Sequence, residues 1–184
     1  MRYTLAHAAT SSKCDILVIG ITDGKCHIKD KQASQTIEDA IKNNPFGSKQ
    51  QKYLLLPGAL GFSAKRVLLV AQENKALSPF NFRAMAKSII QECKKAHAAS
   101  IALDLESFQQ LKNDPSHTTR LFIEAASECY YHYHTYKNTS RDRNTPSLAK
   151  LFLIDSNRKH ASAIKKGAEE GFAIGSAALT TLAL

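Results

Sequence analysis

The sequence predicts an α/β fold in which a mixed, mostly buried β-sheet is flanked by helices on both faces. Three observations support this prediction. The stretch from Arg66 to Ala71 is apolar without alternation, as in a strand that is covered on both faces. Apolar residues at helical spacing follow it from Pro79 to Ala98. Strand and helix patterns then alternate along the chain, which is typical of a layered α/β domain.

The first half of the chain holds most of the predicted strands. Four segments are expected to form them, namely Tyr3–His7, Asp15–Ile21, Tyr53–Leu56 and Arg66–Ala71. A short helix is predicted from Ser34 to Asn43, where Asn44 and Pro45 end it. Because the strands are concentrated in this half, we expect parallel and antiparallel pairs together in one sheet.

The second half alternates helices with single strands. Ser78 can cap the helix that begins at Pro79, and a proline suits the first turn of a helix. The remaining predicted elements are a strand at Ser100–Leu103, a short helix at Leu105–Lys112, a helix at Thr119–Tyr133, a strand at Lys150–Ile154 and a helix from Asn157 to the end. No internal repeat and no shift in composition mark a second folded domain.

The charge of the chain suggests one class of partner. Its 184 residues suffice for one domain with a buried core, and they carry a formal net charge of +9. Such a surface attracts anions, nucleic acid among them. The best candidates for nucleic-acid contact are Lys137, Arg141, Arg143, Arg158 and Lys159. The alternative is a solvated loop and helix face, with the charge serving solubility or being balanced by another part of a larger protein.

The cysteines and the apolar segments indicate a cytoplasmic protein. The four cysteines, Cys14, Cys26, Cys93 and Cys129, form no CxxC pair and have no ligand-like spacing to histidine. We expect them to be small buried side chains in a reducing compartment. The N-terminus lacks the apolar core of a signal peptide, and no apolar run reaches the roughly 18 to 20 residues of a membrane span.

No residues form a set with the spacing of a catalytic or metal site, so none is predicted. His132 and His134 lie in a segment with helical periodicity, where side chains two residues apart point about 200° away from each other and cannot share an ion. The segment Gly20–Lys25 resembles a phosphate-binding loop. Its spacing is one residue short, however, and no serine or threonine follows the lysine.

Three glycines form a stripe on the predicted last helix. Gly167, Gly171 and Gly175 recur at four-residue steps, and each costs about 1 kcal/mol in a helix interior. We expect this stripe to meet either the domain's own sheet or a further domain at close range. A membrane pairing motif is the alternative, but charged residues beside the stripe argue against it, namely Lys165, Lys166, Glu169 and Glu170. The sequence after Gly171 is nearly all apolar, so the chain looks cut short.

Three segments of the chain, in their order, resemble the N-terminal domain of the leucyl aminopeptidase (cytosol aminopeptidase) family. The first joins Lys52–Pro57 to Lys65–Val70 and is similar to the family's strand, turn and Arg-begun apolar strand. The second, Glu124–Lys137, is similar to its Ala-rich helix with an aromatic end. The third, Ala163–Leu179, resembles its linker helix. Two stretches depart from the family pattern, Ala71–Glu73 and Thr180–Leu184. One interpretation of the latter is that these residues are foreign to the natural sequence.

The resemblance implies a macro-domain-like fold and a division of the chain. Residues 1–155 would be the N-terminal α/β domain, and residues 156–184 a linker helix leading toward a catalytic domain that is absent from this sequence. In the family, that domain holds two divalent metal ions, zinc or manganese, which activate water for peptide hydrolysis. Its Asn-Thr-Asp-Ala-Glu-Gly-Arg-Leu motif does not occur here. The chain alone is therefore expected to be inactive and to hold no metal.

The resemblance also implies partners, and two other functions remain open. Family members are hexamers that act on peptides, and some bacterial members bind DNA partly through this domain. A free-standing nucleic-acid-binding module is one alternative, based on the charge of +9. A nucleotide-binding domain is the other, because the family's N-terminal domain resembles the fold that binds ADP-ribose. The second alternative lacks a convincing Gly-rich loop.

Overall fold

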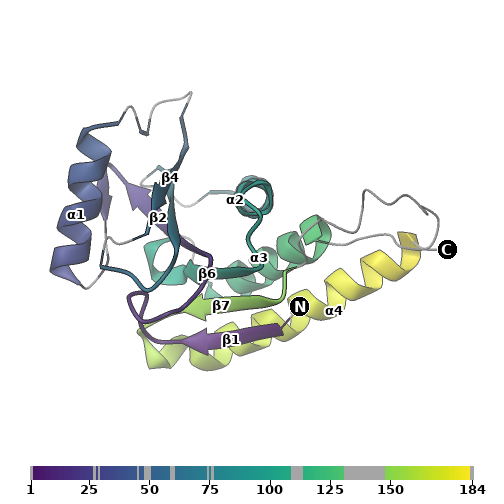
Figure 1. Cartoon of the computed structure of the whole chain (residues 1–184). Helices are drawn as coiled ribbons and strands as arrows, with labels where there is room; N and C mark the ends of the chain where they lie inside the picture. Colours follow the sequence, from purple (N-terminus) through teal and green to yellow (C-terminus); the bar gives the residue numbers. More distant parts are fainter. Residues whose placement is uncertain are drawn as a thin grey trace.

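The computed structural model describes residues 2–26, 28, 30–44, 46–47, 51–58, 61–73, 75, 77–108, 114–130 and 148–182. In this part of the chain a sheet of seven strands lies at the centre (Figure 1). The strands are β1 Arg2–Ala6, β2 Ile16–Thr22, β3 Lys25–Cys26, β4 Tyr53–Pro57, β5 Arg66–Gln72, β6 Ser100–Asp104 and β7 Lys150–Ile154. The α-helices are α1 Lys31–Lys42, α2 Pro79–Lys95, α3 Pro115–Tyr130 and α4 Ala161–Leu182. Two short 3₁₀ helices are η1 Leu105–Ser107 and η4 Arg158–His160.

The sheet is mixed, as predicted. Its strand order is β1-β7-β6-β2-β5-β4, and the pairs from β1 through β5 are all parallel. Strand β4 is antiparallel to β5 and forms one edge. The two-residue strand β3, which was not predicted, pairs with the end of β2 across a turn at Asp23 and Gly24. Both turn residues have positive φ angles, 52° and 72°, which suit a tight reversal.

Helices cover both faces of the sheet, which confirms the predicted layers. Helix α1 packs on one face, and α2 and α3 pack on the other (Figure 1). The central strand β2 is buried along its whole length. Its neighbouring side chains alternate between the two cores, so that Leu17 lies with Ile37 of α1 and Val18 lies with Ile89 of α2.

The long helices begin at the capping residues that the sequence supplies. Ser78 Oγ accepts a hydrogen bond from Asn81 N at 3.3 Å, and Pro79 is the first residue of α2, as predicted. The helix ends at Lys95, three residues before the predicted end, because the chain reverses at His97 with a φ of 55°. Helix α1 begins at Lys31 rather than Ser34, since Asp30 caps it by accepting from Gln32 N and Ala33 N.

Helix α3 differs most from its prediction. It begins at Pro115, four residues before the predicted Thr119, and Asp114 Oδ1 accepts a hydrogen bond from His117 N at 2.9 Å. Pro115 is the first residue of this helix, a position that suits proline. The helix predicted at Leu105–Lys112 is only the 3₁₀ turn η1 within the described residues. His132 and His134 lie outside the described residues.

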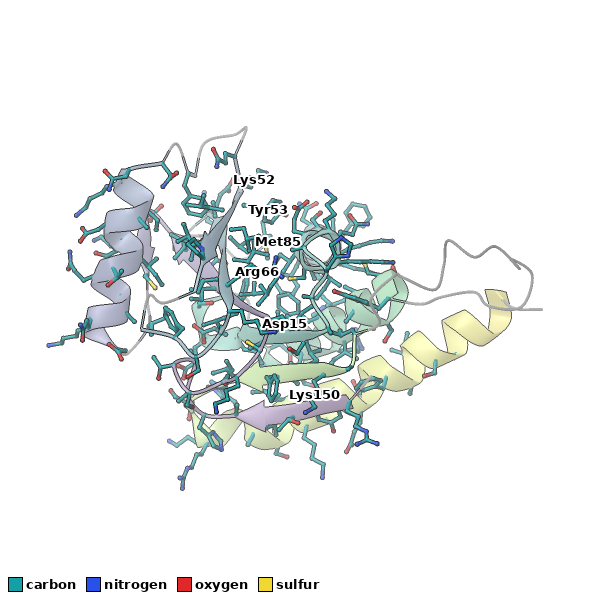
Figure 2. The ribbon with its side chains drawn as sticks, viewed as in Figure 1. Asp15, Lys52, Tyr53, Arg66, Met85 and Lys150 are labelled. Atoms are coloured by element: carbon teal, nitrogen blue, oxygen red, sulfur yellow. The ribbon has the colours of Figure 1, made fainter. Side chains whose placement is uncertain are left out.

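The amino ends of the parallel strands are fixed by two charged side chains. Asp15 Oδ2 accepts hydrogen bonds from Ala99 N, Ser100 N and Ser100 Oγ at 3.0, 2.9 and 3.0 Å, which ties β2 to β6. Arg66 Nη2 donates to Ala96 O, the C-cap residue of α2, at 2.7 Å. Both side chains lie at the same end of the sheet (Figure 2). Asp15 and Arg66 at the amino ends of the strands therefore have a structural role.

Candidate functional site

The carboxyl ends of the parallel strands form the first candidate site. Strand β2 lies between β5 and β6, and the chain passes from β5 across β2 to reach β6. The strand order thus reverses at β2, which is where ligands bind in many open α/β sheets. Polar residues end these strands, namely Thr22 in β2, Gln72 in β5 and Asp104 in β6, and Asp155 follows β7.

The chain itself fills the position in front of β2. Gly20 N donates a 2.7 Å hydrogen bond to Ser107 Oγ, which in turn donates to Asp104 O at 2.6 Å. A Cβ atom at position 20 would lie 2.6 Å from Gln72 Nε2 and 2.7 Å from Ser107 O. The glycine is therefore needed for this close approach. Because its amide is already bonded, it is not available to a phosphate group.

The charge at this edge also opposes an anionic ligand. Asp104 is 5% exposed, and its burial, together with the nearby Glu106 and Asp155, raises its pKa to about 7. Burial likewise raises the pKa of Asp155, although hydrogen bonds from Asn157 and His160 work in the opposite direction. The segment Gly20–Lys25 forms the β2–β3 hairpin rather than a loop that leads into a helix. These observations disfavour nucleotide phosphate at this position.

Hydrogen bonds link the acidic residues to the connection that follows β7. Asp155 Oδ2 lies 2.8 Å from His160 Nδ1, and its Oδ1 accepts from Asn157 N at 2.8 Å. Ser156 Oγ donates to Glu106 Oε1 at 2.5 Å. We name Asp104, Glu106, Asp155 and His160 the carboxyl-edge cluster. This cluster was not predicted, although Asp104 and Asp155 each directly follow a strand that the sequence predicts, which was a signal for both.

The carboxyl-edge cluster does not fit the two metal ions that the resemblance implies. Within the described ranges, no three His, Cys, Asp or Glu side chains are arranged to hold a metal ion. The carboxylate of Asp155 is instead engaged by a backbone amide and by His160. The four cysteines are free and buried, and burial raises the pKa of each thiol. They are therefore poor candidates for ligands or nucleophiles.

The structure describes two of the five residues predicted to contact nucleic acid. Arg158 and Lys159 form the exposed 3₁₀ turn η4, beside the carboxyl-edge cluster. Asn157 Oδ1 accepts a hydrogen bond from Lys159 N at 3.2 Å and so orders this turn. The other three predicted residues, Lys137, Arg141 and Arg143, lie outside the described residues.

The glycine stripe of α4 lies against α3. A Cβ at Gly167 would meet Ser116 O. A Cβ at Gly171 would lie 2.8 Å from Arg120 O, and one at Gly175 would lie 2.7 Å from Ser127 Cβ. At Gly171, Ile123 Cβ is equally close, at 2.8 Å. The partner of these glycines is thus α3 of the same domain, whereas the expected partners were the sheet or a further domain. Small residues allow the two helix backbones to approach closely.

The rest of α4 lies beside β1 and extends past it (Figure 1). Phe172 stacks on Tyr3 of β1 with ring centroids 5.5 Å apart. Ile174 is 44% exposed on another side of the helix. Lys165 and Glu169, at 4.0 Å, form an exposed pair near its start. Among the residues whose structure is described, no helix is long and apolar enough to cross a membrane.

Comparisons with known proteins support one family. Residues 18–140 match the model of the cytosol aminopeptidase family, N-terminal domain. A probable cytosol aminopeptidase of Haemophilus influenzae (strain PittEE) is 22% identical over 178 residues, which cover 91% of this chain and 36% of that protein. The chain thus spans about a third of the length of this curated relative.

Solved structures share the fold. A tomato leucine aminopeptidase mutant superposes with a TM-score of 0.59 at 16% identity, covering 90% of this chain and 35% of that chain. An Oceanobacillus iheyensis macrodomain with MES bound has a TM-score of 0.62 at 8% identity, covering 95% of this chain and 92% of that chain. The predicted macro-domain-like fold is therefore confirmed. Since the family match extends over more than half of the sequence, the chain belongs to the cytosol aminopeptidase family, as its N-terminal domain.

Proposed function

We propose that this chain is the non-catalytic N-terminal domain of a metallo-aminopeptidase that releases N-terminal amino acids from peptides. The match of residues 18–140 to the N-terminal domain model carries this proposal. The named relative is a probable aminopeptidase roughly three times as long, which leaves room for a catalytic domain. The two-metal site, with zinc or manganese, would lie in that domain, because the described residues of this chain do not fit one.

Residues 1–155 would form the body of this domain, and residues 156–184 would lead toward the catalytic domain. Helix α4 supports this role because its second half passes the end of the sheet (Figure 1). Its glycine stripe fixes the first part of the helix on α3. In this proposal the full-length protein is a cytoplasmic homo-hexamer that acts on peptides.

A peptidase assay of the isolated chain tests the proposal. With a chromogenic leucine amide and added zinc or manganese, we expect no release of the chromophore, because peptide hydrolysis would require the missing metal ligands. The carboxyl-edge cluster brings three carboxyl groups together at the carboxyl ends of the strands, so Asp155→Asn is the informative variant. A metal-dependent activity that persists through repurification and disappears in Asp155→Asn would contradict the proposal.

Weak nucleic-acid binding is a second candidate function. The net charge of +9 and the exposed side chains of Arg158 and Lys159 favour it. The acidic groups close to this turn weaken the local positive potential, so the basic segment around Arg141 and Arg143, which lies outside the described residues, would have to contribute as well. Such binding would be a second role of the aminopeptidase and would not replace the first.

A further inference from the structure

Strand β4 forms one edge of the sheet, and its outer side meets no other strand in the described part of the chain. Among the described strands it pairs with β5 alone, in antiparallel orientation. Hydrogen bonds mark both ends of this pairing, since Ala71 N donates to Lys52 O at 2.8 Å and Gly58 N donates to Lys65 O at 2.7 Å. Residues 52 and 58 are therefore hydrogen-bonded positions, and in an antiparallel pair such positions recur at every second residue.

The backbone of β4 is consequently engaged by β5 only at alternate residues. Leu54 and Leu56 direct their amide and carbonyl groups toward β5, whereas those of Tyr53 and Leu55 point away from the sheet. No described residue forms a hydrogen bond with the backbone of Tyr53 or Leu55. The edge thus presents these amide and carbonyl groups to a further extended strand, which is how exposed sheet edges accept one.

The side chains along this edge are apolar on both faces of the sheet. Tyr53 packs against the core beneath α2 and α3, and Leu54 and Leu56 pack against the core beneath α1. Leu55 lies on the same face as Tyr53 and is still 42% exposed. A strand added beside β4 would cover the Leu55 side chain and would place its own apolar side chains next to it.

The charge around β4 favours an acidic partner. Between Asp39 and Glu73 the sequence contains five basic residues and no acidic one. Lys52, directly before the strand, is exposed and forms no ion pair with a described carboxylate. Arg66, opposite Pro57, donates to a backbone carbonyl oxygen rather than to a carboxylate. A second copy of the chain would bring the same positive charges to this edge, whereas an acidic segment would neutralise them.

The acidic side chains in this region have basic neighbours. Glu92 Oε1 of α2 lies 2.7 Å from Lys95 Nζ, and Asp15 is likewise paired with a lysine. Glu73, which directly follows β5, is exposed, and so is Lys75 two residues later. These neighbours leave the charge around the edge positive, which would also speed the encounter with an acidic segment.

We propose that the outer edge of β4 binds an extended polypeptide segment that carries apolar residues at alternate positions between acidic residues. The segment would continue the sheet through main-chain hydrogen bonds to Tyr53 and Leu55. Its apolar side chains would cover Leu55, and its carboxylates would lie near Lys52. This binding is separate from peptide hydrolysis and does not depend on the aminopeptidase function.

Peptides that differ only in backbone methyl groups test the proposal. The probe is a fluorescein-labelled peptide with valines at three alternate positions, threonines between them and a pair of aspartates at each end. One variant is N-methylated at the valines and the other at the threonines. Each set of methyl groups blocks the main-chain hydrogen bonds on one side of an extended strand and leaves charge and side chains unchanged. In fluorescence anisotropy the parent and one variant should bind, and the other variant should lose at least about tenfold in affinity.

Amide hydrogen exchange followed by NMR locates the bound peptide. In the free chain, the amides of Leu54 and Leu56 should exchange more slowly than those of Tyr53 and Leu55. The peptide should slow exchange at Tyr53 and Leu55 at least about tenfold and leave the amides of α3 unchanged. The proposal would be overturned if the parent peptide did not bind, if both methylated peptides bound equally well, or if the new protection lay at η4 instead of β4.

The contribution of charge and the alternative of a second copy need separate measurements. Lys52→Gln should weaken binding of the acidic peptide about threefold at low salt, whereas Lys31→Gln, at the exposed start of α1, is the matched control and should leave affinity unchanged. A peptide with lysines in place of its aspartates should bind at least about tenfold more weakly, and equal binding would contradict the proposed partner. In sedimentation equilibrium of the chain alone, a dimer that Leu55→Lys dissociates would assign the edge to a second copy and overturn the proposal.

Discussion

Two aspartates at opposite ends of the parallel strands, Asp15 and Asp104, show how neighbours determine the behaviour of the same side chain. Burial alone would raise the pKa of Asp15, but hydrogen bonds from Lys65 and Ser100 outweigh it and lower the pKa to about 2. Asp104 meets acidic neighbours instead, and its pKa rises to about 7. In the sequence, Asp15 stands at the start of an apolar strand and Asp104 stands at the end of one. The sequence does not show the partners that the fold brings in from distant segments, such as Lys65 and Ser100, which lie 50 and 85 residues from Asp15 in the sequence.

Asp15→Asn should destabilise the fold by about 1 to 3 kcal/mol at pH 7, since it removes charge-assisted hydrogen bonds from Ala99 and Ser100. The pKa of Asp15 is lowered, so its contribution is present above the ordinary value of 3.8 and is lost as the pH falls toward 2. Urea unfolding at pH 7 and pH 2.5 measures both effects. The difference between the two proteins should shrink at pH 2.5.

Asp39→Asn is the matched control for this substitution. Asp39 forms an exposed pair with Lys42, and such pairs contribute little to stability. The free energy of unfolding should change by less than about 0.5 kcal/mol. A loss at Asp15→Asn that is equally large at both pH values would show that the carboxylate charge is not the cause.

At the scale of elements, the sequence predicted types better than boundaries and partners. Helix α3 began earlier than predicted because Asp114 and Pro115 can either end one helix or start the next. Strand β3 is too short for any periodic pattern. The stripe of Gly167, Gly171 and Gly175 correctly identified one face of α4. Periodicity identifies a face but not what covers it, so the contact with α3 was not predictable from the sequence.

Gly171→Ala and Gly171→Leu should both destabilise the protein. A Cβ at this position would lie 2.8 Å from Arg120 O and from Ile123 Cβ, so α4 must move away from α3. Alanine gains about 1 kcal/mol of helix propensity, but we expect the clash with a backbone atom to exceed this gain. Leucine should cost at least about 1 to 3 kcal/mol as overpacking. Thermal or urea unfolding measures both variants.

Ala173→Leu, on an exposed side of the same helix, is the control and should change stability by less than about 0.5 kcal/mol. The prediction would be contradicted if Gly171→Ala and Gly171→Leu both stabilised the protein. That outcome is typical of a glycine that faces solvent. It would mean that the packing of α3 on α4 does not hold in solution.

At the scale of the whole molecule, the sequence predicted the layers but not the strand order. The apolar runs within β2 and β5 favour central positions, and both strands lie inside the sheet. Nothing in their sequences determines that β6 lies on the other side of β2, or that β1 pairs with β7 at the far edge. These pairings join segments about 85 and 148 residues apart, and they decide which charged groups meet at the carboxyl edge.

The sequence likewise predicts the net charge of the molecule but not where the fold places the charged groups. The composition predicts a basic surface, but the fold places Arg158 and Lys159 next to buried carboxyl groups. A net charge of +9 can therefore act in two ways. It can attract DNA through a localised patch, or through the diffuse field of many separate lysines and arginines.

The salt dependence of DNA binding separates these two possibilities. We expect the chain to bind duplex DNA weakly and without sequence preference, and each neutralised phosphate to steepen the log-log salt dependence by about 0.9. If the patch makes the contacts, replacing Arg141, Arg143, Arg158 and Lys159 with alanine should flatten the slope by up to about 3.6. A control that removes the same charge elsewhere replaces the exposed residues Lys25, Lys31, Lys42 and Lys95. It should lower affinity slightly and leave the slope nearly unchanged. An equal flattening by both sets would assign binding to the diffuse field, and an absence of binding at low salt would exclude this function for the chain.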